Sequence, residues 1–270
     1  MSKTTRGTII LNWVAFSAVL MVNALANILP INGYNTGQIS AFYPNYFVPA
    51  GFTFSIWGLI YLLLLLYTIT ISVFALYQPL AEHKAHAYIS SINRWYILSC
   101  VYNIAWILFW HYLMAGASVL IMLFILFSLL QVFRKGKDKL KTFPLHLQFL
   151  LGAPFTVYLG WISVATIANI TAYLVKTGWR GGPLEQDIWS AVMITIAIVL
   201  ALFILLRFRV AGFTLTVAWA LWGIRASQGP GSELLLRIST AGVITLLVVV
   251  VIERIVTYFF SSNNFKTIGW

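Results

Sequence analysis

The segment 149–176 constrains the fold most strongly, because it is long and apolar and yet contains polar side chains. It reads FLLGAPFTVYLGWISVATIANITAYLVK, and about 20 apolar residues at roughly 1.5 Å each suffice to cross a bilayer core of about 30 Å. Polar groups at that depth need partners or cost free energy. The residues that depart from a plain apolar span are Pro154, Trp161, Ser163, Thr166, Asn169 and Thr171. Because Ala165 and Ala168 are small, another helix or a flat ligand can approach closely there. The pattern predicts a helix that forms the wall of a pocket inside a membrane helix bundle.

The composition indicates an all-α polytopic membrane protein. Of the 270 residues 61% are hydrophobic and only 9% are charged, and a soluble domain of this length cannot cover so much apolar surface. Apolar runs predict eight spans at 9–29, 52–77, 95–113, 115–133, 147–174, 188–206, 210–225 and 235–258. The first run also fits a signal peptide, but its length and its asparagines favour a retained helix. The seventh lies between Arg209 and Arg225 and is short, so a re-entrant segment is the alternative, which would move the C-terminus to the other side.

Basic residues set the predicted orientation. The formal net charge of +11 is explained by topology, so we expect no nucleic-acid partner. With eight spans, all but four of the 17 lysines and arginines fall on the N-terminal side, and the exceptions are Lys176, Arg180, Arg225 and Arg237. Both termini are therefore predicted to be cytoplasmic. No Arg/Ser-rich transit segment precedes the first span, which favours a bacterial inner membrane over an organelle. The single cysteine, Cys100, lies in a predicted span, so no disulfide framework forms within the chain.

The sequence predicts no catalytic residue, no metal site and no required cofactor. No lysine lies mid-span to form a retinal Schiff base, and no Asp or Glu lies mid-membrane to drive transport by protonation. His83 and His86 have metal-ligand spacing but lack a third ligand, so we interpret them as part of a solvated loop. For His111, an axial or donor role competes with an interfacial position beside Trp110 and Tyr112, and we favour the second.

Aromatic side chains provide the main functional signal. Trp57 and Tyr61 share a face of the second span, and Asn103 and Trp106 share a face of the third. Membrane tryptophans usually form belts at the interface, but Trp161 lies mid-span. An uncharged aromatic cavity favours a flat, apolar ligand held by stacking and oriented by indole N–H groups and asparagines. For Asn103 and Asn169, a hydrogen bond between helices is equally compatible with the pattern.

The loop from Pro30 to Gly51 contains no Lys, Arg, Asp or Glu and is rich in aromatic residues. Such a loop is expected to fold over the mouth of the bundle or to lie at the interface, rather than to extend into water. We interpret it as a lid over an outward-facing pocket, formed by Tyr34, Tyr43, Pro44 and Pro49.

Three segments together resemble the tryptophan-rich sensory protein family (TspO/MBR), which includes the translocator proteins of mitochondria. PNYFVPAGFTFSIWGLIY is similar to the family's proline-rich loop running into a helix with Trp and Tyr, here Trp57 and Tyr61. NIAWILFW resembles the Asn-x-x-Trp segment at Asn103 and Trp106, and PFTVYLGWISVATIAN resembles the Pro-Tyr-Leu-x-Trp helix that contains Trp161. The chain departs from the pattern at Val48-Pro49, where the family has Pro-Pro, and no sterol site is expected because the family's cholesterol-recognition pattern is only partly present.

The resemblance covers about 12–176 and implies a five-helix bundle with a tetrapyrrole- and drug-binding pocket under the loop after the first helix. We therefore expect a TspO-like domain at 1–176 and about three additional transmembrane helices at 177–270, to which no role beyond packing or oligomer contact is assigned. The resemblance makes Trp57 and Trp161 the two pocket tryptophans and Ala165 a small wall residue. It also implies a homodimer. Family members include enzymes that degrade protoporphyrin in light, transporters and stress regulators.

The leading hypothesis is an integral membrane binding protein for porphyrin-type or similar flat hydrophobic ligands, in the manner of a sensor or regulator. The predicted ligand-binding residues are Trp57, Tyr61, Asn103, Trp106, Trp161, Ala165 and Asn169. The alternatives are a facilitator of a small apolar metabolite, light-dependent porphyrin degradation, or a scaffold whose aromatic residues only pack the bundle. The expected partners are the lipid bilayer and a hydrophobic small molecule.

Overall fold

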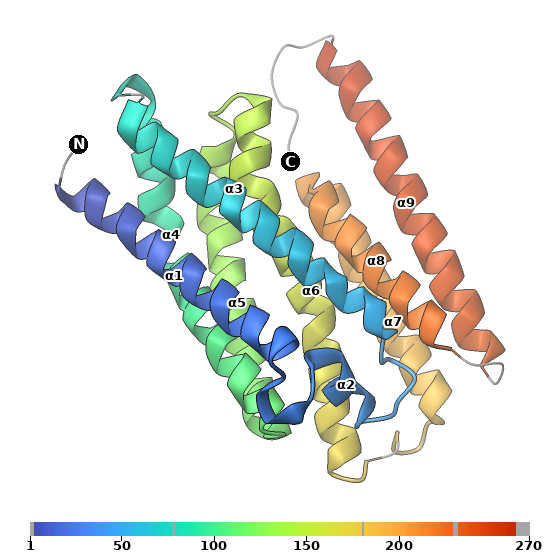
Figure 1. Ribbon diagram of the computed structural model, residues 1–270. Coiled ribbons are helices and arrows are strands. Elements are labelled where there is room, and N and C mark those ends of the chain that lie inside the picture. The colour runs from blue at the N-terminus through green and yellow to red at the C-terminus, as the bar shows by residue number, and fades with distance from the viewer. Residues whose placement is uncertain (1–2, 78, 180, 229–231, 263–270) are drawn as a thin grey trace. The chain divides into compact units, whose positions relative to one another are not determined.

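The computed structural model describes residues 3–77, 79–179, 181–228 and 232–262, and the regular secondary structure within these ranges is entirely helical (Figure 1). The long helices are α1 (Lys3–Ile28), α3 (Ile56–Tyr77), α4 (Pro79–His111), α5 (Ala115–Leu140), α6 (Leu145–Lys176), α7 (Gln186–Phe208), α8 (Ala211–Ser227) and α9 (Glu233–Ser262). Three short elements lie between α1 and α3, namely η1 (Ile31–Gly33), α2 (Thr36–Ala41) and η2 (Gly51–Ser55). The predicted all-α fold is confirmed.

Each predicted span corresponds to one long helix, and the largest difference is at the start of α4. This helix begins at Pro79, whereas the apolar run predicted a span only from residue 95. The additional turns contain Glu82, Lys84 and Arg94, which are compatible with a helix but interrupt an apolar run. His83 and His86 therefore lie on a helix, and the interpretation of this segment as a loop is wrong.

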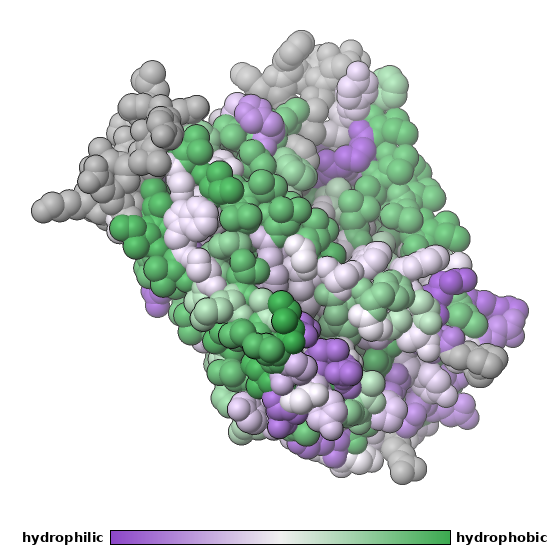
Figure 2. Space-filling view, viewed as in Figure 1, coloured by the Kyte–Doolittle hydropathy of each residue, from purple (hydrophilic) through white to green (hydrophobic). Residues whose placement is uncertain are grey.

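Within the described residues, six helical segments are long and apolar enough to cross a membrane. They are Gly7–Ile28, Gly51–Phe74, Ala115–Leu140, Leu145–Lys176, Gln186–Phe208 and Glu233–Phe259. Figure 2 shows that apolar side chains cover much of the visible surface, as expected of a protein that faces lipid. Helix α8 has 17 residues, and α4 carries charged residues in its first half and many aromatic residues in its second. The crossing of the membrane by these two helices stays a prediction.

The chain forms two compact units, and the first comprises Met1–Asn35 and Trp57–Leu159. In this unit α4 packs against α1 and α5. A Cβ atom at Gly136 of α5 would lie 3.0 Å from the Tyr88 ring and 3.2 Å from Ile92, so glycine allows the close approach of α5 to α4. The Tyr88 hydroxyl also donates to the Leu151 carbonyl of α6 at 2.9 Å, which joins α4 to the first half of α6.

The second unit comprises Thr36–Ile56 and Gly160–Trp270, so it combines the loop before α3 with the C-terminal helices. Helices α7, α8 and α9 pack against one another, and α8 also packs against η2. A left-handed residue, Arg209, ends α7 with its N–H donating to the Leu205 carbonyl at 2.7 Å, so that α8 begins two residues later. Helix α9 approaches closely because its Gly242 lies against Ile198 and Leu221. The predicted domain boundary after residue 176 stays a prediction.

Helix α6 belongs to both units and is the most buried of the candidate spans. Every residue from Leu151 to Ile162 is buried. Its mid-span hydroxyls are satisfied within the helix, because Thr166 donates to the Ile162 carbonyl at 2.7 Å and Thr171 donates to the Ile167 carbonyl at 2.9 Å. Backbone acceptors one turn earlier in the helix thus provide partners for these two hydroxyls.

Candidate ligand-binding site

A cluster of aromatic rings surrounds Trp57 at the beginning of α3, in the first unit. Trp57 stacks on Tyr61 one turn later, with ring centroids 5.7 Å apart and an interplanar angle of 17°. Trp106 of α4 lies 6.3 Å from Trp57 and itself stacks on Trp110 at 5.9 Å. Tyr158 of α6 meets Trp57 edge-on at 5.7 Å. We call these five residues the Trp57 cluster. Three helices contribute to it, so its geometry depends on tertiary packing.

A chain of buried amides and a phenol lies beside the Trp57 cluster. The Asn103 amide of α4 donates to the Tyr158 hydroxyl at 2.8 Å. Asn23 of α1 in turn donates to the Asn103 side-chain oxygen at 2.7 Å and to its own helix at the Val19 carbonyl. The Val19 carbonyl can only accept, so the side-chain atom of Asn23 that bonds to it is the nitrogen. This nitrogen also bonds to Asn103, which therefore accepts through its oxygen and directs its own nitrogen to Tyr158. The chain links α1, α4 and α6 and holds Tyr158 against Trp57.

The Trp57 cluster is buried, and it contains an unsatisfied hydroxyl. Trp57 is 8% exposed, Tyr61 9% and Trp106 5%, while Asn103 is fully buried. The Tyr61 hydroxyl has no hydrogen-bond partner among the side chains and backbone that the structure describes. A buried hydroxyl without a partner costs about 1–3 kcal/mol, and the Tyr67 and Tyr96 hydroxyls of this unit are in the same situation. At Tyr61, a ligand with an acceptor atom would satisfy the hydroxyl.

The other predicted ligand-binding residues belong to the second unit. Trp161 is 3% exposed, and its indole meets the Phe54 ring of η2 edge-on at 5.9 Å. Ala165 is half-buried and Asn169 is buried. Because these three residues are spaced by four, they lie along one face of the second half of α6. The predicted site residues are therefore divided between the two units, with Trp57, Tyr61, Asn103 and Trp106 in the first.

The predicted lid loop is bonded to the C-terminal end of α8. The Ala50 N–H donates to the Gly223 carbonyl, and the Trp219 indole N–H donates to the Thr53 carbonyl, both at 3.0 Å. Two further side chains, Ser227 and Gln228, donate to the carbonyls of Val48 and Tyr46 at 2.6 and 2.8 Å. Phe52 also meets the Trp219 ring edge-on at 5.6 Å. Helix α8 therefore positions the loop, a role that the sequence did not suggest.

The four predicted lid residues have different environments. Tyr43 is buried, whereas Tyr34 and Pro44 are exposed and Pro49 is half-buried. Burial raises the pKa of the Tyr43 phenol above its ordinary value, so this group is neutral at physiological pH. Tyr34 belongs to the first unit, and the other three belong to the segment that α8 holds.

His111 lies at the end of α4 and joins this helix to η1. His111 is buried, and its Nδ1 lies 3.1 Å from the Ile31 carbonyl. The Asn32 side chain donates to the His111 carbonyl at 3.0 Å, so η1 is joined to α4. His111 is covered by η1, and its predicted position at the membrane interface stays a prediction. Within the described residues, no three His, Cys, Asp or Glu side chains gather as a metal site.

Two residues of the site were missed by sequence reasoning. Tyr158 lies one helical turn before Trp161, and its place in a span of mixed polarity could have suggested a buried partner for Asn103. Asn23 was noted only as a polar residue in the first span. Pairing of these two with Asn103 depends on the packing of α1 and α6 around α4, which no local pattern contains.

Comparison with known proteins gives one family match. The family model described as TSPO-like protein matches residues 9–253. No curated protein and no solved structure matches the chain. The match continues beyond residue 176 through α7 and α8 and into α9, so the resemblance extends further than the three motifs indicated. This match and the apolar helices indicate a multi-pass membrane protein of the ligand-binding or transport type. The chain belongs to the family of TSPO-like proteins.

Proposed function

We propose that the protein binds a flat, hydrophobic ligand of the porphyrin type at the Trp57 cluster. The observation that carries the proposal is the buried, unpartnered hydroxyl of Tyr61 within a stack of aromatic rings. A porphyrin offers both a large π surface for the rings and acceptor atoms, in its pyrrole nitrogens and carboxylates, for the hydroxyl. A ligand of this class therefore matches both features of the cluster.

The binding energy would come mainly from stacking and from burial of apolar area. Each favourable aromatic pair contributes about 0.5–1.5 kcal/mol beyond the area that it buries. In the absence of a ligand, Trp57 makes such contacts with Tyr61, Trp106 and Tyr158. A flat ligand would enter by replacing contacts between rings with contacts between ring and ligand. The cost of separating the rings is thereby largely offset.

Asn103 would act as a positioning residue. Its amide is held between Asn23 and Tyr158, so it keeps the Tyr158 ring edge-on to Trp57. The predicted ligand contacts of Trp161, Ala165 and Asn169 belong to the second unit and stay a separate prediction. The ligand contacts that the family resemblance implies for the loop with Tyr34, Tyr43, Pro44 and Pro49 likewise stay a prediction. The expected homodimer belongs to this proposal as well, and size-exclusion chromatography with light scattering tests it.

The Tyr61→Phe variant tests the proposal, because it removes the hydroxyl and keeps the ring. The purified protein is titrated with protoporphyrin IX in the dark, and the Soret shift reports binding. We expect the variant to bind at least fivefold more weakly than the wild type. The matched control is Tyr112→Phe, since Tyr112 is 61% exposed and lies outside the cluster. Equal affinity in all three proteins would argue against a ligand contact at Tyr61.

A further inference from the structure

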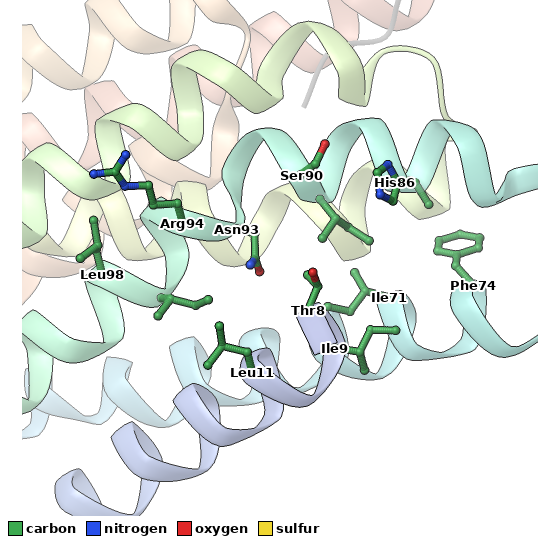
Figure 3. Close-up of a pocket in the computed structure, with 13 residues that line it drawn as sticks. Thr8, Ile9, Leu11, Ile71, Phe74, His86, Ser90, Asn93, Arg94 and Leu98 are labelled. Carbon is green, nitrogen blue, oxygen red and sulfur yellow. The ribbon is translucent and has the colours of Figure 1, made fainter. Parts of the chain in front are cut away.

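A second cavity, separate from the Trp57 cluster, lies among α1, α3 and α4 of the first unit (Figure 3). It has a volume of about 500 Å³, within the range of roughly 300–1,000 Å³ that is typical of small-molecule sites. None of its lining residues belongs to the Trp57 cluster. Phe74, which lines it, lies about 20 Å along α3 from Tyr61, at a rise of about 1.5 Å per residue. We call this cavity the α1/α4 cleft.

Most of the lining is aliphatic. The apolar residues are Ile9 and Leu11 of α1, Ile71 and Phe74 of α3, and Ala85, Ile89, Ile97 and Leu98 of α4. Leu11 is 47% exposed, so the cleft opens to the surroundings of the protein and is not a closed core cavity. An open cleft with walls of this kind is suited to a hydrocarbon chain.

One edge of the cleft is polar and positively charged. Ser90 follows His86 by four residues, and Asn93 and Arg94 follow Ser90 by three and four, so each lies about one turn from Ser90 along α4. Among the lining residues that the structure describes, none is acidic. Arg94 is exposed, with its guanidinium 5.5 Å from the centroid of the neighbouring Trp95 ring. Among the side chains that the structure describes, none forms an ion pair with Arg94. The edge is therefore suited to an anionic group.

Asn93 adds oriented donors on the side of α4 that faces α1 (Figure 3). Asn12 donates through its amide nitrogen to the Thr8 carbonyl at 2.7 Å and to the Asn93 side-chain oxygen at 2.6 Å. The Thr8 carbonyl can only accept a hydrogen bond, so the atom of Asn12 that bonds to it is the amide nitrogen. The same nitrogen also bonds to Asn93, which must therefore accept through its side-chain oxygen. Its N–H groups are thus left to donate elsewhere, and Figure 3 shows the Asn93 side chain pointing from α4 toward α1. Such donors suit phosphate oxygens, and Arg94, which points away from Asn93 in Figure 3, adds a positive charge on the same helix.

The cleft lies near the ends of two candidate membrane spans. Thr8, Ile9 and Leu11 belong to the first turns of the candidate span Gly7–Ile28, and Ile71 and Phe74 to the last turn of Gly51–Phe74. Lipid headgroups lie at this depth, and the hydrocarbon core begins next to it. According to the charge distribution in the sequence this is the cytoplasmic side, where anionic lipids attract basic residues.

We infer that the α1/α4 cleft binds an anionic phospholipid of the surrounding bilayer, with one acyl chain against the aliphatic wall and the phosphate at Arg94 and Asn93. The lipid fills a cavity that would otherwise weaken the packing among α1, α3 and α4. This site is independent of the proposed porphyrin-type ligand, because the two share no residue.

Native mass spectrometry of the delipidated, detergent-purified protein tests the inference. We expect a one-to-one complex with phosphatidylglycerol that is at least fivefold tighter than the complex with phosphatidylcholine of the same acyl chains. Arg94→Gln should lower the affinity for phosphatidylglycerol to that for phosphatidylcholine. The matched control is Arg207→Gln, because Arg207 is also exposed and lies 5.3 Å from the ring of the following residue, Phe208. This control should bind both lipids as the wild type does.

A second variant tests the position of the acyl chain in the cleft. Leu11→Trp, at the exposed mouth of the cleft, should weaken the binding of both lipids at least fivefold. An unchanged melting temperature would confirm that the variant is folded. Equal affinity for the two lipids, or an equal effect of Arg94→Gln and Arg207→Gln, would overturn the inference, since either result indicates nonspecific attraction. Tighter binding of free palmitate than of phosphatidylglycerol would also overturn it, because the occupant would then be a fatty acid.

Discussion

Gly223 of α8 lies directly against the side chain of Thr53 in η2. A Cβ atom at Gly223 would come within 2.6 Å of the Thr53 Cγ2 and 2.8 Å of its Cβ. The same glycine accepts a hydrogen bond from the Ala50 N–H through its carbonyl. The loop before α3 thus needs glycine at this position of α8, because any side chain would push the loop away.

We predict that Gly223→Ala destabilises the protein by about 1–3 kcal/mol, as overpacking of a tight contact does. Gly58→Ala is the matched control, because both glycines lie in helices and a Cβ at Gly58 would meet nothing within 4 Å. Since alanine favours a helix over glycine, the control should be neutral or slightly stabilising. Thermal unfolding in detergent gives the comparison. If both variants melt at the same temperature, the close contact at Gly223 does not hold the loop.

Trp219→Phe should loosen the loop without unfolding the bundle. The variant keeps an aromatic ring near Phe52 but loses the indole N–H that donates to the Thr53 carbonyl. A lost hydrogen bond of about 1 kcal/mol predicts amide exchange about fivefold faster in the loop. Hydrogen exchange of residues 46–56 measures the effect. Trp222→Phe serves as the control, since Trp222 is 46% exposed, and it should leave exchange in the loop unchanged.

Asn103→Ala should be among the more damaging changes of a single polar residue. Its loss leaves the buried Asn23 amide and the Tyr158 hydroxyl without their shared partner, which we expect to cost about 1–3 kcal/mol. Asn27→Ala is the matched control, because Asn27 is exposed and, among the residues that the structure describes, its side chain donates to the Asn23 carbonyl of its own helix. A melting temperature of Asn103→Ala no lower than that of Asn27→Ala would show that the amide chain does not stabilise the fold.

Tyr61→Phe should change stability and affinity in opposite directions. Removing a buried hydroxyl that has no partner is expected to stabilise the unliganded protein by about 1 kcal/mol. The same change should weaken porphyrin binding, since it removes the donor. Melting curves recorded with and without protoporphyrin IX measure both effects. A variant less stable than the wild type in the absence of ligand would mean that the hydroxyl has a structural partner.

Local patterns were sufficient to predict most of the helices and part of the site. The spacing of Trp57 and Tyr61 predicts a shared helical face, and the two rings stack in the structure. The start of α4 was not predictable from apolar runs, because its first turns lie outside any run and contain Glu82 and Lys84. Helix formation depends on backbone propensity as well as on hydropathy, so hydropathy located the apolar part of α4 and missed the rest.

Contacts between distant segments were not predictable. The bond from the Trp219 indole to the Thr53 carbonyl joins residues 166 positions apart, and its acceptor is a backbone group that every residue has. The role of α8 in holding the loop therefore has no signature in either segment alone. The same reason explains why Asn23 and Tyr158 were missed, although each was visible as a polar group in an apolar run.

The most direct test of porphyrin-type binding at the Trp57 cluster is a titration of the detergent-purified protein with protoporphyrin IX in the dark. Tryptophan quenching and the Soret shift are followed for the wild type, Trp57→Phe, Trp161→Phe and the exposed control Trp222→Phe. We predict saturation near one ligand per chain and affinity at least tenfold weaker in Trp57→Phe, a change of about 1.4 kcal/mol. Trp222→Phe should not weaken binding, and Trp161→Phe tests the separate prediction that Trp161 contacts a ligand. Linear, unsaturated quenching that is identical in all four proteins would contradict the proposal, because porphyrin would then only partition into the micelle.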